Sequence, residues 1–173
     1  HPPIDDELSA KHFEVLVEET SKQGLTHYET CSFGLPEYFS RHNMSYWFGK
    51  TYMGVGPSAH SFDGIKRSWN VSNNSTYIKS LDADELPFES ELLSVENRFN
   101  EYIMTGLRTM EGINPEQLHA VYGRDPRTAD AQAWQSAVLK RELIQLPNGS
   151  FRIPEDNWLF ADAIASELFW VND

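Results

Sequence analysis

Apolar residues recur at helical spacing in the second half of the chain. Phe99, Ile103 and Leu107 stand four residues apart, which predicts a helix over residues 94–110 that Gly112 closes. The elements expected after it are a short helix over 114–122 with Asn114 as its N-cap, a helix over 128–143, a hairpin over 144–153 built on Asn148-Gly149, and a last helix capped by Asp156. This order of three helices, a hairpin and a helix is that of a winged helix.

The first half follows a different pattern. Acidic residues at 5–7 and a broad apolar face predict a helix over 5–23, and Gly24 supplies the left-handed position that ends it. A strand is expected over 26–33, and a helix that leads into a strand through a two-residue turn is typical of the end of a larger α/β domain. Because the chain opens on His1 without an initiator Met, we interpret it as a piece of a longer protein.

Residues 37–75 are rich in glycine, asparagine and other turn-forming residues. Only a short strand near 50–55 is expected there, and so long an irregular stretch in a compact domain is usually functional. A short helix over 76–81 follows, and the polar run after it is the best linker. We therefore divide the chain into residues 1–87 and residues 88–173.

Charge and composition narrow the range of partners. The 26 acidic and 14 basic residues give a formal net charge of −12, and acidic residues outnumber basic ones in both halves. A nucleic-acid surface needs clustered basic residues, so nucleic acid is not an expected partner. No apolar run approaches the roughly 20 residues of a membrane span. Cys31 is the only cysteine, which excludes an internal disulfide or a Cys-rich metal site and makes the cytoplasm the default compartment.

Candidate chemistry gathers between residues 28 and 70. The residues concerned are Tyr46, Trp47, Tyr52, Phe62 and Trp69, set among His42, Asn43, His60 and the glycine turn Gly54-Val55-Gly56-Pro57. Aromatic rings beside imidazoles, with a backbone that permits close approach, suit a flat and partly apolar ligand. The remaining histidines His12, His27 and His119 are interpreted as surface or edge positions.

Several motifs carry a more specific signal. They are Tyr28-Glu29, Ser32-Phe33, His42-Asn43-x-x-Tyr46-Trp47, Gly54-Val55-Gly56-Pro57-Ser58-Ala59-His60, Arg67-x-Trp69-Asn70, and Gly106-Leu107-Arg108-Thr109 with Glu111-Gly112-Ile113. On these motifs the chain resembles the C-terminal part of the oxygen-independent coproporphyrinogen III oxidase family, and most closely its heme-chaperone branch, over residues 5–169.

The resemblance implies an α+β fold. Residues 1–87 would form the C-terminal end of a partial (β/α) radical-SAM barrel, and residues 88–173 a helical winged-helix-like domain. It also implies S-adenosyl-L-methionine and a [4Fe–4S] cluster held by an N-terminal CxxxCxxC motif. Because this chain has a single cysteine, the cluster and most of the S-adenosylmethionine site are expected upstream of His1, and radical chemistry by these 173 residues alone is excluded.

The resemblance further implies a heme site at His42, Asn43, Tyr46 and Trp47. The His42 imidazole would be an axial ligand of heme iron, and the two aromatic rings would flank the macrocycle. The alternative is that His42 and Asn43 hydrogen-bond a loop backbone while Tyr46 and Trp47 fill the core.

The glycine turn is expected at the edge of the nucleoside cofactor. The residues implied are Gly54, Gly56, Ser58, Ala59 and His60. The alternative is a tight turn that ends a barrel strand. Two further residues admit both kinds of interpretation: Arg67 pairs with a heme propionate or lies on the surface, and Cys31 ligates heme or is a small buried hydrophobe.

Three functions stay open from the sequence. The first is a heme chaperone that binds heme or a porphyrin and delivers it to a client heme protein. The second is an enzyme, the full-length protein, that converts coproporphyrinogen III to protoporphyrinogen IX by oxidative decarboxylation. The third is a non-catalytic winged-helix interaction module. An exposed strand edge in a cut barrel also favours self-association.

Overall fold

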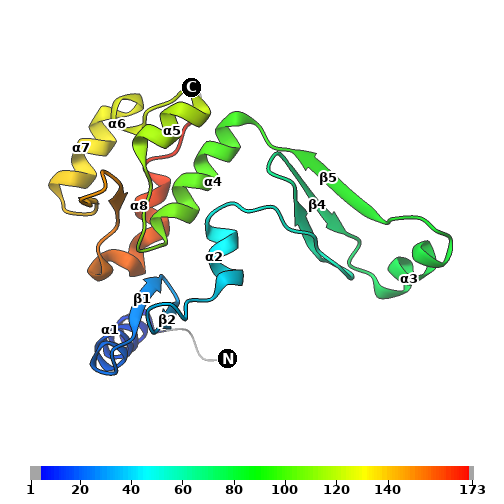
Figure 1. Cartoon of the computed structure of the whole chain (residues 1–173), viewed down its shortest axis with the longest axis horizontal. Coiled ribbons are helices and arrows are strands. Elements are labelled where there is room, and N and C mark those ends of the chain that lie inside the picture. The colour runs from blue at the N-terminus through cyan, green and yellow to red at the C-terminus, as the bar shows by residue number, and fades with distance from the viewer. Residues whose placement is uncertain (1–4, 172–173) are drawn as a thin grey trace.

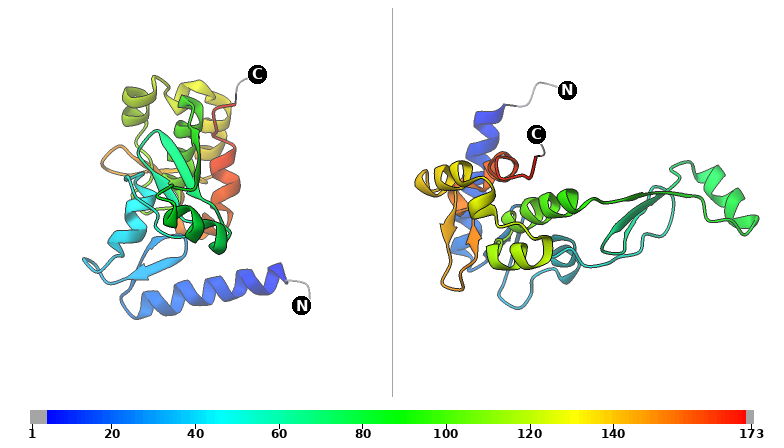
Figure 2. Two further views of the ribbon diagram at one scale, coloured as in Figure 1. Left: turned by 90° about the vertical axis from the view of Figure 1, so that its right-hand side faces the viewer. Right: turned by 90° about the horizontal axis from the view of Figure 1, so that it is seen from above.

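The computed structural model describes residues 5–171, and the start of the chain at His1 lies outside them. The fold combines helices with antiparallel strands. A helical body holds the main core, and a three-stranded sheet with helix α3 (Asn74–Asp82) extends from this body as an arm (Figure 1, Figure 2). Helix α3 confirms the helix expected over 76–81 and begins earlier, because Asn73 caps it.

Helix α4 (Val95–Leu107) is the central element of the body. Phe99, Ile103 and Leu107 are buried, which confirms the helix that their spacing predicts. The expected end is wrong, because α4 stops at Leu107 with Arg108 as its C-cap, so Gly112 does not close it. The elements packed around it are α5 (Pro115–Tyr122), α6 (Pro126–Ala129), α7 (Ala131–Leu139), β6 (Ile144–Gln145), β7 (Phe151–Arg152), the 3-10 helix η1 (Glu155–Phe160) and α8 (Ala161–Ser166). Their core side chains include Ile113, Leu118, Trp134, Ile153, Trp158 and Ile164.

Two further expectations for the body are wrong in detail. The helix expected over 128–143 is two helices, because Pro126 begins α6 and the Asp130 carboxylate accepts the Ala133 N–H at 2.9 Å to begin α7. Asp156 does not cap the last helix, since it lies inside η1, which has no side-chain cap. The order of helices and hairpin is as predicted, and the winged-helix assignment stays a prediction.

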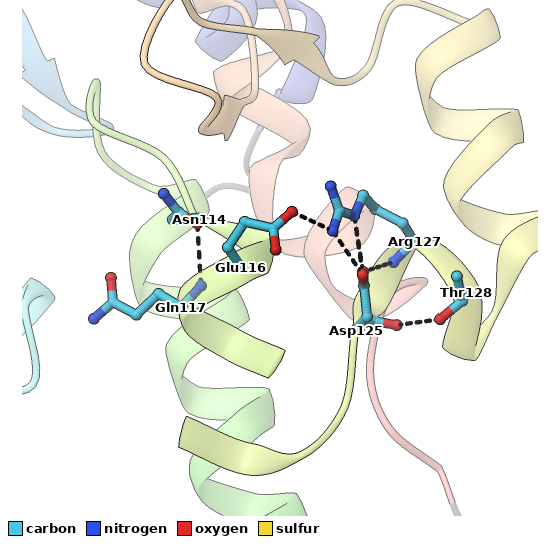
Figure 3. Close-up of polar contacts among 6 residues, drawn as sticks. All are labelled: Asn114, Glu116, Gln117, Asp125, Arg127 and Thr128. Carbon is cyan, nitrogen blue, oxygen red and sulfur yellow. Dashed lines mark hydrogen bonds and ion pairs between the residues drawn. The ribbon is translucent and has the colours of Figure 1, made fainter. Parts of the chain in front are cut away.

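Polar contacts fix α5 to α6 (Figure 3). Asn114 caps α5 as predicted, because its Oδ1 accepts the Gln117 N–H at 3.1 Å. Asp125 caps α6 by accepting the Arg127 N–H at 2.9 Å, and its Oδ2 also lies 2.7 Å from Nη2 of the Arg127 guanidinium. The same Nη2 lies 2.6 Å from Glu116 Oε1. Charge-assisted hydrogen bonds therefore link the two helices at the edge of the body.

The single strand expected over 26–33 is instead an antiparallel hairpin. The elements at this end of the chain are α1 (Asp6–Lys22), which was predicted, and the strands β1 (Thr26–Glu29) and β2 (Ser32–Gly34). Thr30 and Cys31 make the turn, because the Thr30 N–H donates to the Arg108 carbonyl at 3.0 Å and the Cys31 N–H donates to the Glu29 carboxylate at 3.2 Å. The partial barrel stays a prediction.

The expectation that residues 37–75 hold little regular structure is wrong. The elements of this stretch are α2 (Arg41–Trp47), β3 (His60–Phe62) and β4 (Lys66–Asn70). Helix α2 begins where the Ser40 hydroxyl accepts the Asn43 N–H at 3.2 Å. The strand expected around Tyr52 is only an isolated bridge between that residue and Phe62.

The sheet of the arm has the antiparallel order β3-β4-β5, with β5 at Phe88–Leu92. Strand β5 begins where the second domain was predicted to begin, and it pairs with β4 from the first part of the chain. Phe62 lies opposite Arg67, and His60 lies opposite Trp69. Since side chains alternate along a strand, these four residues share one face of the sheet.

Candidate functional site: an aromatic cleft

A cleft of about 440 Å³ lies between α2, the arm and the body. We call it the aromatic cleft, because the rings of Tyr46, Trp47, Tyr52, Phe62, Tyr102 and Tyr122 line it. Tyr46 and Trp47 come from α2, and Phe62 comes from β3 of the arm. Tyr52 lies between α2 and β3. Tyr102 comes from α4, and Tyr122 comes from α5. Its volume lies in the range of about 300–1,000 Å³ that is typical of ligand pockets.

A row of aromatic rings leads from α2 into the cleft. His42 and Tyr46 are one helical turn apart, with ring centroids 4.9 Å apart and planes at 90°. The Tyr46 ring lies 4.6 Å from that of Tyr52, which in turn lies 6.2 Å from that of Phe62. His42 is exposed, and its ring nitrogens form no hydrogen bond with another described residue. Its imidazole is therefore accessible beside the cleft.

Trp47 connects α2 to the body. The centre of its ring lies 5.3 Å from the guanidinium carbon of Arg108, which is a cation–π contact. Its indole N–H is buried and has no hydrogen-bond partner within residues 5–171. Tyr46 is 40% exposed and Trp47 is half-buried, and neither belongs to the main core cluster.

The charged side chains that line the cleft, within the described part of the chain, are Arg67, Arg98 and Glu101. The guanidinium of Arg67 is paired with the Glu101 carboxylate, and its Nη1 lies 3.7 Å from Glu91 Oε1. Arg98 forms no ion pair with a described carboxylate, and its buried Nε has no hydrogen-bond partner there. The cleft thus has more positive than negative side chains in a chain whose formal net charge is −12.

Three tyrosines make the wall polar without adding charge. Burial raises the pKa of Tyr52, of Tyr102 and of Tyr122, so that each phenol is neutral near pH 7. The Tyr102 hydroxyl donates a hydrogen bond to Gln117 Oε1 at 3.1 Å. The cleft therefore combines aromatic ring faces, neutral phenol hydroxyls and two guanidinium groups, that of Arg67 in ion pairs and that of Arg98 without one among the described residues.

A second hollow, of about 470 Å³, is lined by Ser58 and His60 and lies farther along the same sheet face. The backbone beside this hollow requires glycine at position 54, because a Cβ atom there would lie 2.2 Å from the His60 carbonyl oxygen. The Gly56 N–H donates to the Tyr77 hydroxyl at 3.3 Å, which ties the turn to α3. Ser58 has a φ of 60°, a conformation that costs energy for a residue with a side chain.

The structure divides the predicted site residues among four places. Tyr46, Trp47 and Arg67 line the aromatic cleft, Ser58 and His60 line the second hollow, His42 and Asn43 lie exposed at the start of α2, and Gly54, Gly56 and Ala59 belong to the turn before β3. Residues that are close in the sequence between 42 and 67 are thus separated in the fold between the aromatic cleft and the glycine turn.

Sequence reasoning missed the contribution of the body to the cleft. Arg98 and Tyr102 come from α4, and Tyr122 comes from α5. The available signal was the spacing of Arg98 and Tyr102, which stand four residues apart and so share one face of α4 beside its apolar face.

Two residues outside the cleft lie where the sequence did not place them. Cys31 is exposed at the turn of the β1–β2 hairpin, so it is not a buried hydrophobe. His27 is buried, with its ring stacked 4.1 Å from that of Phe33 and edge-on at 4.2 Å from that of Trp158. Over the described range, no group of three or more His, Cys, Asp or Glu side chains is arranged to hold a metal ion, and no helix is long and apolar enough to cross a membrane.

Known proteins with similar sequences include heme chaperones. HemW of Mycobacterium tuberculosis is 32% identical over 117 residues, which cover 67% of this chain and 30% of that protein. This chain is a homologue of HemW. The HemW of Bacillus subtilis is 28% identical over 124 residues, or 71% of this chain and 32% of its own length. The resemblance predicted from the motifs is confirmed, and the HemW homologue spans about 30% of the length of these relatives.

Two more distant likenesses extend this result. Radical S-adenosyl methionine domain-containing protein 1, a mitochondrial protein of Danio rerio, is 26% identical over 152 residues, or 78% of this HemW homologue and 34% of the relative. The solved structure of coproporphyrinogen III oxidase HemN from Escherichia coli, a radical SAM enzyme, matches with a TM-score of 0.67 at 11% identity, over 90% of this chain and 39% of that one. At this identity the match shows a shared fold alone. No family model matches the chain.

Proposed function

We propose that this chain is the heme-binding part of a heme chaperone, with α2 and the aromatic cleft as its heme surface. The observation that carries the proposal is the exposed imidazole of His42, whose ring lies 4.9 Å from that of the cleft residue Tyr46. The homology to HemW supports heme as the ligand. Delivery of heme to a client heme protein, in the cytoplasm, belongs to the same proposal.

The residues of the cleft fit a heme. A neutral imidazole is a normal axial ligand of heme iron, and His42 has one that is free of protein hydrogen bonds to the described residues. Tyr46 and Trp47 offer ring faces to a macrocycle. His60 lies in the second hollow, with its ring 6.3 Å from that of Trp69, and has no part in this ligation.

S-adenosyl-L-methionine and a [4Fe–4S] cluster belong to our proposal for the longer protein. Cys31, the only cysteine, lies on an exposed turn, so three thiolates would have to come from outside this chain. Ser58, Ala59 and His60, with the glycine turn, are the residues proposed to face the nucleoside. S-adenosylmethionine bound there would supply an adenosyl radical after one-electron reduction by the cluster.

The second candidate function is the oxidative decarboxylation of coproporphyrinogen III by the full-length protein. The shared fold with HemN favours it. A turnover assay of the full-length protein with coproporphyrinogen III separates the two candidates, because a chaperone binds heme without converting this substrate. An interaction module without a ligand would neither bind heme nor show turnover.

Replacement of His42 by alanine tests the heme surface. In the full-length protein we expect a shifted Soret band and a loss of heme affinity of at least about tenfold, the size of effect seen at perturbed metal sites. Tyr46→Phe keeps the ring face and removes one hydroxyl, so its cost should stay near about 1 kcal/mol. The matched control is His60→Ala, which should leave the spectrum unchanged. An unaltered spectrum and affinity in His42→Ala would remove His42 from the site.

A further inference from the structure

We infer that Arg98 binds a carboxylate of the ligand inside the aromatic cleft, so that the cleft selects planar aromatic molecules that carry a carboxylate. The inference rests on the proposed function, in which the ligand is a heme with two propionates. It assigns a residue on α4 that lies 56 positions after His42 to the same site.

Arg67 was the sequence candidate for this contact, but its guanidinium is already engaged. It pairs with the Glu101 carboxylate, and its other terminal nitrogen lies 3.7 Å from Glu91 Oε1. Glu91 is held opposite Arg67 by the register of β4 and β5, so the second contact is built into the sheet. A ligand carboxylate would have to compete with both protein carboxylates for Arg67.

Arg98 is in the opposite situation. Its side chain lines the cleft, forms no ion pair with a described carboxylate, and has a buried Nε without a hydrogen-bond partner among residues 5–171. Glu101, one turn farther along α4, is taken by Arg67. The Tyr102 hydroxyl donates its hydrogen bond to Gln117, and no hydrogen bond joins it to Arg98 within the described residues. A ligand carboxylate in the cleft would give the Arg98 guanidinium the charged partner that it lacks among the described residues, through charge-assisted hydrogen bonds.

The surroundings of Arg98 favour an anion that is also aromatic. The charges lining the cleft are two guanidinium groups and one carboxylate, although the whole chain has a formal net charge of −12. Tyr122 is close enough that the Arg98 charge lowers its pKa slightly against the larger raising effect of burial. The rings of Tyr46, Tyr52 and Phe62 line the same cleft and offer faces to a flat ring system.

The experiment compares acids with their esters. Heme, heme dimethyl ester, iron-free protoporphyrin IX and its dimethyl ester are titrated into the full-length protein and into Arg98→Gln and Arg98→Lys. The esters keep the planar ring and lose the carboxylate charge. The matched control is Arg124→Gln, because the Arg124 guanidinium carbon lies 4.4 Å from the centre of the Trp170 ring and this side chain does not line the cleft.

We expect Arg98→Gln to lose about tenfold in affinity for both acids, which is roughly 1.4 kcal/mol, and to bind both esters as the unmodified protein does. The affinity of Arg98→Lys for the acids should lie between those of Arg98→Gln and the unmodified protein, because an ammonium group keeps the charge but loses the planar fork of the guanidinium. Arg124→Gln should match the unmodified protein for all four compounds.

The inference is overturned if Arg98→Gln weakens acids and esters equally, if it weakens neither, or if none of the four compounds binds. Failure of the proposed heme ligation looks different. Protoporphyrin IX has no iron, so an acid-specific loss for it in Arg98→Gln supports the carboxylate site even where His42→Ala leaves the Soret band of bound heme unchanged.

Discussion

At the scale of single residues, His27 is a buried titratable group outside the cleft. Its imidazole is buried between the rings of Phe33 and Trp158, and burial lowers its pKa. The backbone of Thr30 lies near enough to oppose this shift, but neither ring nitrogen has a hydrogen bond of good geometry with a described residue. The folded state therefore favours the neutral ring.

The pH dependence of stability should show this residue. Because the unfolded chain keeps the ordinary pKa of 6.5, it binds more protons than the folded state below that pH. The stability is fully present above about pH 6.5 and decreases as the pH falls toward the lowered folded value. Urea unfolding at pH 7.5 and pH 5.5 should thus show a smaller loss for His27→Phe than for the unmodified protein. An equal loss in both proteins, with exposed His12→Gln as control, would contradict the assignment.

At the scale of elements, the sequence predicts those whose signals are local. Asn114 caps α5 as predicted, α4 begins beside its cap Ser94 where the helix was expected to begin, and Asn148-Gly149 makes the turn between β6 and β7. Capping and apolar spacing act within a few residues, so one segment contains the whole signal.

Helix α2 and strand β5 lack such local signals. The residues of α2 have no helical apolar period, and its only clear mark is the cap Ser40, inside a stretch rich in turn formers. All five residues of β5 are exposed, so no alternation of apolar and polar positions reveals the strand. Its extended conformation comes from pairing with β4, a strand that precedes α3 while β5 follows it.

The same distinction separates the site residues. The motif that contains Tyr46 and Trp47 pointed to one wall of the cleft. Arg98, Tyr102 and Tyr122 also line the cleft, but they belong to α4 and α5. The sequence pattern of these helices is explained by the apolar residues that they bury in the core, so nothing in it indicated a site. The cleft exists only where α2 and the sheet meet the body, and such a meeting cannot be inferred from spacing within one segment.

The contact between α5 and α6 gives a prediction at this scale (Figure 3). Asp125→Ala removes the cap of α6 and the partner of Arg127, so we expect a loss of about 1–2 kcal/mol in the free energy of unfolding. The hydrogen bond from Arg127 lowers the Asp125 pKa, so this contribution is present above pH 3.8 and is lost as the pH falls below it. Asp156→Ala is the control, because Asp156 forms no capping bond, and should change stability by less than about 0.5 kcal/mol. Equal effects in chemical denaturation would refute this assignment.

At the scale of the whole molecule, burial is unevenly distributed. The main core cluster lies entirely after residue 98, in the body. The arm and the residues between α2 and β3 expose apolar side chains, with Met53 82%, Val55 80% and Leu92 77% accessible. Helix α1 has no buried residue. The body therefore has the contacts of an independently stable unit, and the first half has few of them.

Hydrogen exchange of the whole chain should reveal this difference. We expect the amides of Phe99–Leu107 to exchange slowest, because they lie in α4 with four buried residues. The amides of residues 50–60 should exchange fastest among the described interior segments, since this stretch contains only the isolated bridge at Tyr52 and a few turn hydrogen bonds. Ligand binding in the cleft should slow exchange at residues 46–52 more than in α4, because only the former are poorly protected beforehand. Slower exchange across 50–60 than across α4 in the free protein would show that the arm, and not the body, is the stable part.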